Sequence, residues 1–328
     1  MASTTDIQTR FLIISDTHGQ EFPHELKPQV GVDVAIHCGD ITQSSTLEEF
    51  KTGLRLLGDI NAPLKLIISG NHEFSLDTPI FKKRISEVSG NITAEDIKKG
   101  FGDFGEARQL FETAKSKGIV FLDEGIYHFN LQNGASLTVY ASPHTPSMSA
   151  LDEGAFQYDK EQDHSRQWPV EPNVDIIITH GPPKGIFDRA LDSDDKMKSI
   201  GSASLFAAIF QSRPKMHCFG HVHRAWGAKL VTWRNVAVDR PSHLNAIDNE
   251  ASHVVETLDS LLSTPFDSAL DAVRKRRKLE RFLSRRCCTV EDMPKAGEQT
   301  LFINAAIEGD ECQPMHLPWV ATIGLPAR

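Results

Sequence analysis

The sequence predicts an α/β fold in which helices cover a sheet on both faces. Short apolar runs without polar alternation recur along the chain, and several end in a polar loop that contains glycine. Runs of this kind are typical of strands buried on both faces. Helix-compatible stretches separate them, and alternating strands and helices favour an α/β sheet. The runs are Phe11–Ile14, Val32–Ile36, Leu64–Ile68, Val174–Ile178 and Met216–Phe219.

The helix-compatible stretches follow the spacing of an amphipathic helix. Thr46 is a plausible cap, and the stretch from Thr46 to Leu57 carries apolar residues on one face. Similar patterns predict helices over 106–117 and 202–210. The strand at 136–140 and the last strands can pair antiparallel. Two polar segments, 75–104 and 143–173, are rich in turn formers and are interpreted as loops at the rim of a site.

Length and composition predict a single domain that spans residues 1–328. The chain has 328 residues, of which 40% are hydrophobic and 24% charged, as in ordinary globular proteins. The region from about 234 to 298 is mostly polar and partly basic, and a strand-like pattern resumes over 300–305. We therefore interpret 234–298 as an insertion within the domain.

The charge and cysteine content exclude several classes of protein. A net charge of −9 disfavours a surface built for nucleic acid. The five cysteines form no C-x-x-C pair, so neither a disulfide framework nor a cysteine zinc site is indicated. No secretory signal and no apolar run long enough to span a membrane are visible, so we expect a cytoplasmic protein without a membrane partner.

One basic run stands out from this acidic background. Residues 274–286 hold eight Lys or Arg among thirteen residues. Such a run can be a nuclear-import signal, which would allow a nuclear location, or a patch for nucleic acid or anionic lipid. It can equally be a solvated helix or loop balanced by Asp267, Asp271 and Glu280, which is the interpretation we favour. Any protein partner of this region is unknown.

Metal-ligand residue types follow the predicted strands directly. Because binding sites in open α/β sheets form beyond the carboxyl ends of strands, these side chains can converge although they are far apart in sequence. Two Asp, one Asn and four His suit a pair of divalent cations, and imidazole with carboxylate favours Mn, Fe or Zn over Mg or Ca. Each residue alone is a weak signal, but the ordered set is not. The set is Asp16, His18, Asp40, Asn71, His180, His221 and His223.

In this order the motifs resemble those of the calcineurin-like metallophosphoesterases. They are D-x-H (Asp16 to His18), G-D (Gly39-Asp40), G-N-H-E (Gly70 to Glu73), a strand ending in His180, and G-H-x-H (Gly220 to His223). The resemblance covers residues 10 to about 230, with a strand resuming at 300–305. It implies a two-sheet β-sandwich flanked by helices, the four-layer fold of this family, with a dimetal site at the carboxyl ends of the strands.

The resemblance also implies a role for each residue. Asp16, His18 and His223 would hold the first metal, and Asp40 would bridge the two. Asn71, His180 and His221 would hold the second. A hydroxide between the metals would attack phosphorus, and His72 would assist the leaving group from beside the metals. A lesser role for His72, as a rim residue that orients Asp40, is the alternative.

Departures from related groups narrow the expectation to phosphodiesters. Protein phosphatases of the superfamily carry arginines after G-D and before G-N-H-E. Here Ile41-Thr42-Gln43 follows Asp40, and Ser69 precedes Gly70. The sequence is most similar to small metallophosphoesterase-domain proteins of the 239FB type, through 37–40, 179–183, 213–220 and 302–305. That similarity implies hydrolysis of small, cyclic nucleotide-like phosphodiesters. The alternatives are a phosphomonoesterase, a catalytically idle metal-binding scaffold, or a nuclease guided by the basic run.

Several further residues are candidates for supporting roles. Arg224, directly after G-H-x-H, is well placed to bind a substrate phosphate. Phe74, His144 and Trp226 can line the substrate cleft. We expect Cys38 and Cys218 to be packing residues, and His37 and His217 to support the ligands or the core.

Overall fold

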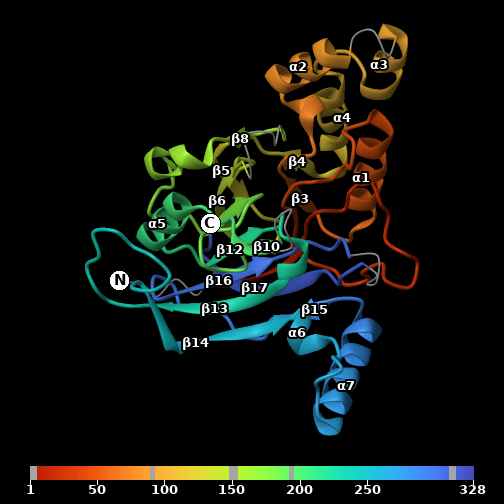
Figure 1. The fold of residues 1–328 in the computed structure, drawn as a ribbon. Helices are drawn as coiled ribbons and strands as arrows, with labels where there is room; N and C mark the ends of the chain where they lie inside the picture. Colours follow the sequence, from red (N-terminus) through yellow and green to blue (C-terminus); the bar gives the residue numbers. More distant parts are fainter. Residues whose placement is uncertain (1–5, 89–92, 148–153, 192–195, 310–314) are drawn as a thin grey trace.

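The computed structural model describes residues 6–88, 93–147, 154–191, 196–309 and 315–328. Two large sheets lie face to face and helices cover their outer surfaces (Figure 1). The predicted two-sheet α/β sandwich is confirmed. Within the described ranges, no helix is both long and apolar enough to cross a membrane.

The first sheet has six strands, and its centre is parallel. β1 pairs in parallel with β2, which pairs with β3 and then β4, whereas β17 runs antiparallel to β1. In spatial order the strands are β15 (Cys288–Thr289), β17 (Trp319–Leu325), β1 (Ile7–Ile14), β2 (Val34–His37), β3 (Leu64–Ile67) and β4 (Ile119–Phe121).

The second sheet has seven strands around a parallel core of β16, β12, β9 and β6. The outer strands β13, β14 and β5 pair antiparallel, as expected for the strand at 136–140 and for the last strands. In spatial order the strands are β14 (Ile247–Thr257), β13 (Gly227–Trp233), β16 (Gln299–Asn304), β12 (Met216–Phe219), β9 (Ile176–Thr179), β6 (Ser136–Ser142) and β5 (Gly125–Asn130). Two small sheets pair β7 (Thr145–Pro146) with β8 (Gln157–Tyr158), and β10 (Arg189–Leu191) with β11 (Met197–Ser199).

Side-chain alternation along the strands builds the layers. In β1, Phe11 and Ile13 point into the core between the sheets, where Ile176 and Ile178 of β9 meet them. The intervening Leu12 and Ile14 pack instead against the helices on the outer face of the first sheet. Both sets are fully buried, which explains why the sequence shows continuous apolar runs.

The predicted helices form where expected and cover both outer faces. α1 (Leu47–Asp59) begins at Thr46, whose side chain and Glu49 form a capping box. α1 and α4 (Glu106–Ala114) pack on the first sheet, and α5 (Ala203–Ser212) packs on the second. The other helical segments are α2 (Thr78–Val88), α3 (Ala94–Phe101), α6 (Leu258–Leu261), α7 (Ala269–Arg285), and the 3-10 turns Phe74–Leu76, Lys115–Lys117, Lys160–Ser165 and His223–Ala225.

The prediction that 75–104 is a loop was wrong, because α2 and α3 occupy most of it. These helices bury a small aromatic cluster around Phe74, Phe81 and Phe101. Only a narrow stripe of each short helix is apolar, so the mean polarity of the segment resembles that of a loop. The segment 143–173 matches its prediction more closely, since its described residues, 143–147 and 154–173, form only β7, β8 and one 3-10 turn.

The polar region 234–298 is joined to both sheets. β14 is an edge strand of the second sheet and β15 is an edge strand of the first. The basic run lies largely in α7, as the favoured interpretation expected, and Asp267 forms one of its ion pairs, 2.8 Å from Lys275 Nζ. Because a strand at the edge of a sheet is partly exposed to solvent, it can carry polar residues on one or both faces. This explains the polar sequences of β14 and β15.

Candidate metal centre

The seven predicted ligands come together where the two sheets meet at the carboxyl ends of their parallel strands. Strands β1, β2 and β3 lead into Asp16 and His18, Asp40, and Asn71. From the second sheet, β9 leads into His180, and β12 leads into His221 and His223. Backbone contacts join the two halves, since His221 N–H donates to the Asp16 carboxylate at 3.0 and 3.1 Å.

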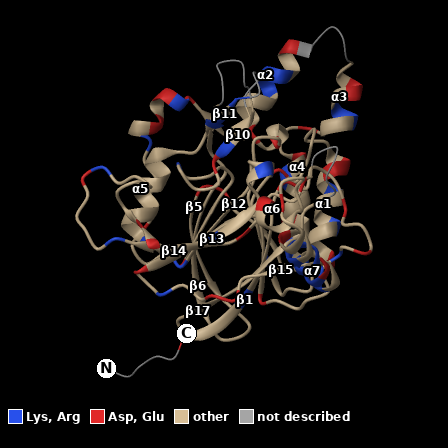
Figure 2. Cartoon of the chain, turned by 60° about the horizontal axis from the view of Figure 1, so that its bottom comes forward, with Lys and Arg blue, Asp and Glu red and all other residues tan. Residues whose placement is uncertain are grey.

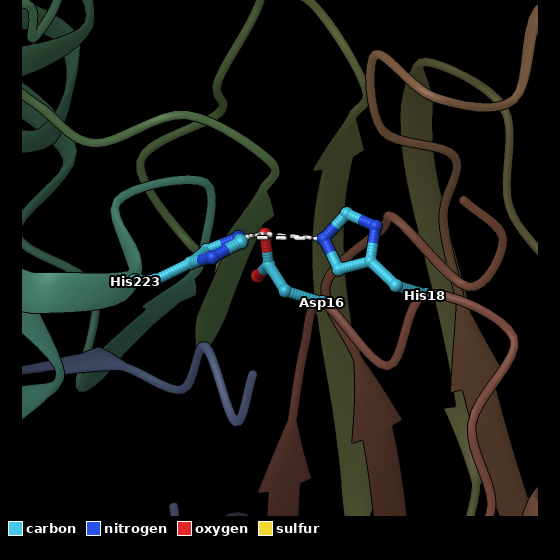
Figure 3. A group of neighbouring side chains, drawn as sticks. All are labelled: Asp16, His18 and His223. Carbon is cyan, nitrogen blue, oxygen red and sulfur yellow. Dashed lines mark hydrogen bonds and ion pairs between the residues drawn. The ribbon is translucent and has the colours of Figure 1, made fainter. Parts of the chain in front are cut away.

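Asp16, His18 and His223 form the first group (Figure 3). Their ligand atoms lie within 4.8 Å of one another. His223 Nε2 is 3.2 Å from Asp16 Oδ1, and the Nε2 atoms of His18 and His223 are 3.3 Å apart. Two imidazole nitrogens and a carboxylate facing one point form the donor set that Zn, Mn and Fe prefer.

Asp40 lies at the centre of two further groups. One joins Asp40 with His180 and His221, and the other joins it with His18 and His72. Asp40 Oδ2 is 3.1 Å from His180 Nε2 and 4.0 Å from His18 Nε2. Asn71 Oδ1 is 2.9 Å from the same His180 nitrogen. This position between the two sets of imidazoles is the one that a bridging carboxylate requires.

The two aspartates remain ionised although they are buried. Burial alone would raise the pKa of Asp16, but the hydrogen bond and charge of His223 outweigh it and hold that pKa well below its usual range. Burial would likewise raise the pKa of Asp40, but the charge and hydrogen bond of His180 outweigh it and hold the pKa of Asp40 well below its usual range. Burial lowers the pKa of His180, but Asp40 outweighs it and raises that pKa to about 9. Protons therefore compete with cations here, so acidification should weaken metal binding.

The ligand loops hold strained backbone. Asp16, His18, Asp40 and His221 all have positive φ, at 56°, 46°, 53° and 68°. Such angles cost about 1–3 kcal/mol each for a residue with a side chain and persist where the surrounding structure enforces them. Four such residues in one cluster indicate that the loops are shaped for the site rather than for stability.

Two motif glycines allow the ligands to approach the backbone. A Cβ added to Gly70 would lie 2.2 Å from Asp40 Oδ1. One added to Gly220 would lie 2.0 Å from Asp16 Oδ2. Both distances are far below van der Waals contact, so the glycines of G-N-H-E and G-H-x-H are required by the positions of the carboxylates.

We therefore expect Gly220→Ala to displace the Asp16 carboxylate. Metal affinity should fall by about 10–100-fold, and the free energy of unfolding should drop by about 1–3 kcal/mol through overpacking. Metal titration and thermal denaturation would measure the two effects. Gly100→Ala in α3 is the matched control, since an added Cβ there meets no described atom within 4 Å. Unchanged metal affinity in Gly220→Ala would contradict the assigned role of Asp16.

His72 stands beside the metal-ligand groups with one ring nitrogen already engaged. Its Nδ1 donates to the Gln43 carbonyl at 2.7 Å, which leaves Nε2 available to another group. Its ring lies edge-on to that of His18, with centroids 4.7 Å apart. Its backbone N–H donates to Asp40 Oδ1 at 2.9 Å. The structure thus places the His72 side chain next to the cluster, within reach of Asp40 and His18.

Two carboxylates at the site were missed by the sequence analysis. Glu308 Oε2 lies 3.2 Å from His18 Nε2 and 3.1 Å from His223 Nδ1. The chain reaches this place because Ile307 N–H donates to Ser15 O beside Asp16, at 3.0 Å. A carboxylate shortly after the predicted strand at 300–305 was the signal that could have identified Glu308.

Glu73 is the second missed carboxylate, and it braces two ligand loops. It is fully buried and accepts hydrogen bonds from the backbone N–H groups of Asp40, Thr42 and Gly70 at 3.0, 2.9 and 2.6 Å. Burial and the Asp40 carboxylate raise the pKa of Glu73 to about 7. The fourth residue of G-N-H-E thus holds the G-D loop against the G-N-H-E loop.

The remaining strand residues support the core. His37 and His217 are fully buried, burial lowers the pKa of each to about 3, and each hydrogen-bonds a threonine next to a predicted ligand: Thr17 at 3.0 Å and Thr179 at 2.8 Å. Burial raises the pKa of the Cys38 and Cys218 thiols, as expected for packing residues. The described cysteines form no disulfide.

The candidate substrate contacts are divided among different places. Phe74 and Arg84 border a cavity of about 380 Å³ that also includes Asn71 and His72. Arg224 borders a second cavity of about 280 Å³, beside His221, His223 and Glu308.

His144 and Trp226 are placed differently. His144 Nδ1 lies 3.5 Å from Glu124 Oε2 and is not among the residues that border these two cavities. Trp226 is 1% exposed and stacks on Trp319 with ring centroids 4.6 Å apart. It borders, with Arg224, a third cavity of about 580 Å³, and it is not among the residues that border the cavity beside His72.

The donor chemistry fits a pair of divalent cations. Buried ionised carboxylates and imidazole nitrogens converge in three overlapping groups. Among the described residues, the ion pairs of Asp16 and Asp40 are with histidines and not with lysine or arginine. His18 Nδ1 is buried and has no hydrogen-bond partner among the described residues, whereas His18 Nε2 faces His223 and Asp16. Asp16, His18 and His223 could hold one cation, with Glu308 beside them. Asn71, His180 and His221 could hold the other, with Asp40 between.

Comparison with known proteins agrees with this arrangement. Residues 9–225 match the family described as calcineurin-like phosphoesterase. The chain is 30% identical over 243 residues to human metallophosphoesterase domain-containing protein 1, across 70% of this chain and 66% of that protein. It is 30% identical over 234 residues to a probable rhamnogalacturonate lyase C of Emericella nidulans, across 70% of this chain but 18% of that protein.

The matched region thus spans less than two thirds of these relatives. Among solved structures, a purple acid phosphatase from yellow lupin (Lupinus luteus) seeds aligns with a TM-score of 0.34 and 11% identity, over 73% of this chain and 42% of that one. The family match covers well over half of the chain and contains every predicted metal ligand. The chain belongs to the calcineurin-like phosphoesterase family.

Proposed function

We propose that this chain is a dinuclear metal-dependent phosphodiesterase that hydrolyses small phosphodiesters. The observation that carries the proposal is the set of three overlapping carboxylate and imidazole groups with His72 beside them. When bound, two divalent cations lower the pKa of a water molecule and neutralise charge on the phosphoryl oxygens. The chain's own residues then position the substrate and manage its protons.

His72 is the residue proposed to protonate the leaving oxygen. The Gln43 carbonyl fixes the ring and keeps the proton on Nδ1 in the neutral form. Protonation then adds a second donor at Nε2, which could hydrogen-bond a leaving alkoxide and transfer the proton to it. This assignment gives His72 a catalytic role, beyond the positioning of Asp40 through its backbone N–H.

The sequences of the two ligand loops around Asp40 and Asn71 favour a diester over a monoester. A monoester presents a dianion, for which arginine forks are the usual partners. The positions after Asp40 and before Gly70 are Ile41 and Ser69, so neither loop supplies an arginine. Phe74 and Phe101 give an apolar wall to the cavity beside His72, where an organic substituent of a diester could lie. These features support cyclic nucleotide-like substrates as the first class to test.

Bis-p-nitrophenyl phosphate and p-nitrophenyl phosphate provide the decisive comparison. We expect the purified chain, depleted of metal and reloaded with Mn²⁺, Fe²⁺ or Zn²⁺, to hydrolyse the diester with the higher kcat/KM. Activity should vanish with chelator and return with metal, and a screen of cyclic nucleotides would follow. Preference for the monoester would instead indicate a phosphomonoesterase. Two bound metals without turnover of either ester would indicate a scaffold.

A further inference from the structure

Helix α7 and the turn before it form an arm that projects from the side of the sandwich. The arm comprises residues 263–286, and α7 extends beyond the sheets near β15 (Figure 1). Its inner side is anchored, because Phe282 is 4% exposed in the main core and Lys278 Nζ pairs with Glu256 at 2.8 Å. The outer side of the arm faces solvent.

The outer side carries apolar side chains at its N-terminal end. Phe266, in the turn before α7, is 96% exposed. Leu270 and Val273, three apart on one face of the helix, are 59% and 42% exposed. Exposure of one phenylalanine and two aliphatic side chains to water is unfavourable in free energy. A partner that offers an apolar environment would remove this surface from water.

Arginines continue along the same side of the helix. Lys and Arg gather on α7 (Figure 2), and the arm has eight of them against Asp267, Asp271 and Glu280, a net charge of +5. Asp267 pairs with Lys275, and Asp271 lies 3.7 Å from Arg274. Across the described part of the chain, no carboxylate forms an ion pair with Arg276, Arg277, Arg281 or Arg285.

The geometry points to α7 as a docking surface for an anionic lipid bilayer, and we propose that the arm binds such membranes peripherally. Arginines are complementary to anionic headgroups, and Phe266, Leu270 and Val273 suit the boundary of the acyl chains. The chain as a whole carries −9, so the remainder carries −14 and would be repelled. A bilayer would therefore be approached with the arm first. This surface is independent of the proposed hydrolysis, and it revises the expectation of no membrane partner.

Vesicle flotation with the full chain tests the proposal. We expect binding to phosphatidylcholine vesicles in which phosphatidylserine is roughly a third of the lipid, little binding to pure phosphatidylcholine, and release by high salt. Each basic residue near such a surface contributes about fivefold to partitioning. Arg277→Glu with Arg281→Glu should therefore lower partitioning at least about tenfold, and Phe266→Ser with Leu270→Ser should do so as well.

Matched controls separate this surface from general effects. Lys115→Glu with Lys117→Glu changes the same charge on a distant 3-10 turn, and Leu244→Ser removes another exposed apolar side chain. Both controls should partition like the parent chain, and all variants should keep its diesterase activity and melting temperature. Absent or variant-insensitive vesicle binding would overturn the proposal. So would binding to a short DNA duplex that the arginine pair abolishes and the Phe266 pair leaves intact, which would assign the arm to nucleic acid.

Discussion

Asp40→Ala is expected to abolish metal-dependent phosphoester hydrolysis. The Asp40 carboxylate is 2% exposed and belongs to two of the three ligand groups, so its loss affects both proposed cation positions. It also leaves His180 Nε2 without the carboxylate that lies 3.1 Å away. Cations at such a site contribute several kcal/mol of transition-state stabilisation. Because each 1.36 kcal/mol changes the rate tenfold, we expect kcat to fall by about 10³-fold or more.

Turnover of bis-p-nitrophenyl phosphate and metal content per chain would measure this effect. Asp175→Asn is a suitable control, because Asp175 is also nearly buried but pairs with Lys215 on another part of the second sheet. The control should lose stability while keeping two metals and its kcat. If Asp40→Ala retained both metals and parent turnover, the central position assigned to this carboxylate would be wrong.

His72→Asn is expected to slow chemistry without removing metal. General acid catalysis contributes about 10²–10⁴-fold, so kcat should fall by that factor for a substrate with a basic alkoxide leaving group. The fall should be small for p-nitrophenyl esters, because nitrophenolate leaves without a proton. Metal content should match that of the parent chain, since the proposed ligands are untouched.

Comparison of alkyl and nitrophenyl diesters therefore distinguishes the roles open to His72. A strong dependence on the leaving group supports proton donation. An equal loss for both substrates, with metals retained, would assign His72 to the positioning of Asp40 through the contact at 2.9 Å. Loss of one metal would instead make His72 a ligand, which its proximity to Asp40 and His18 permits.

The candidate ligands could be predicted because each one follows a short buried strand. Asp16, Asp40 and His221 lie within three residues of the end of a strand that is buried on both faces, and the parallel arrangement brings such strand ends to one edge. The residue types then limit the metals that can bind. The capped helix α1 was similarly visible, since Thr46 and its apolar face are local features.

Other parts of the site depend on contacts that no local pattern encodes. Glu308 reaches His18 only because the segment after β16 runs beside Ser15, which directly follows β1 of the other sheet. Glu73 was visible as a motif letter, but its hydrogen bonds to Asp40 and Thr42 depend on the folding of one loop over another. The helices α2 and α3 and the edge strands β14 and β15 were hidden for a related reason, because each buries too little apolar surface to stand out from a loop.

The sequence by itself therefore determined the α/β class and the residue types of the candidate metal ligands, because these follow from short patterns of burial and residue type. Its ordered motifs indicated the family, and only the resemblance to that family implied the two-sheet arrangement. The tertiary structure alone decided which carboxylates reach the imidazoles from distant segments, and which side chains of the basic run face solvent. Burial and ion pairing depend on the path of the whole chain. In the sequence, Phe266 cannot be told apart from an apolar residue of the core, and only the folded structure shows that it is 96% exposed.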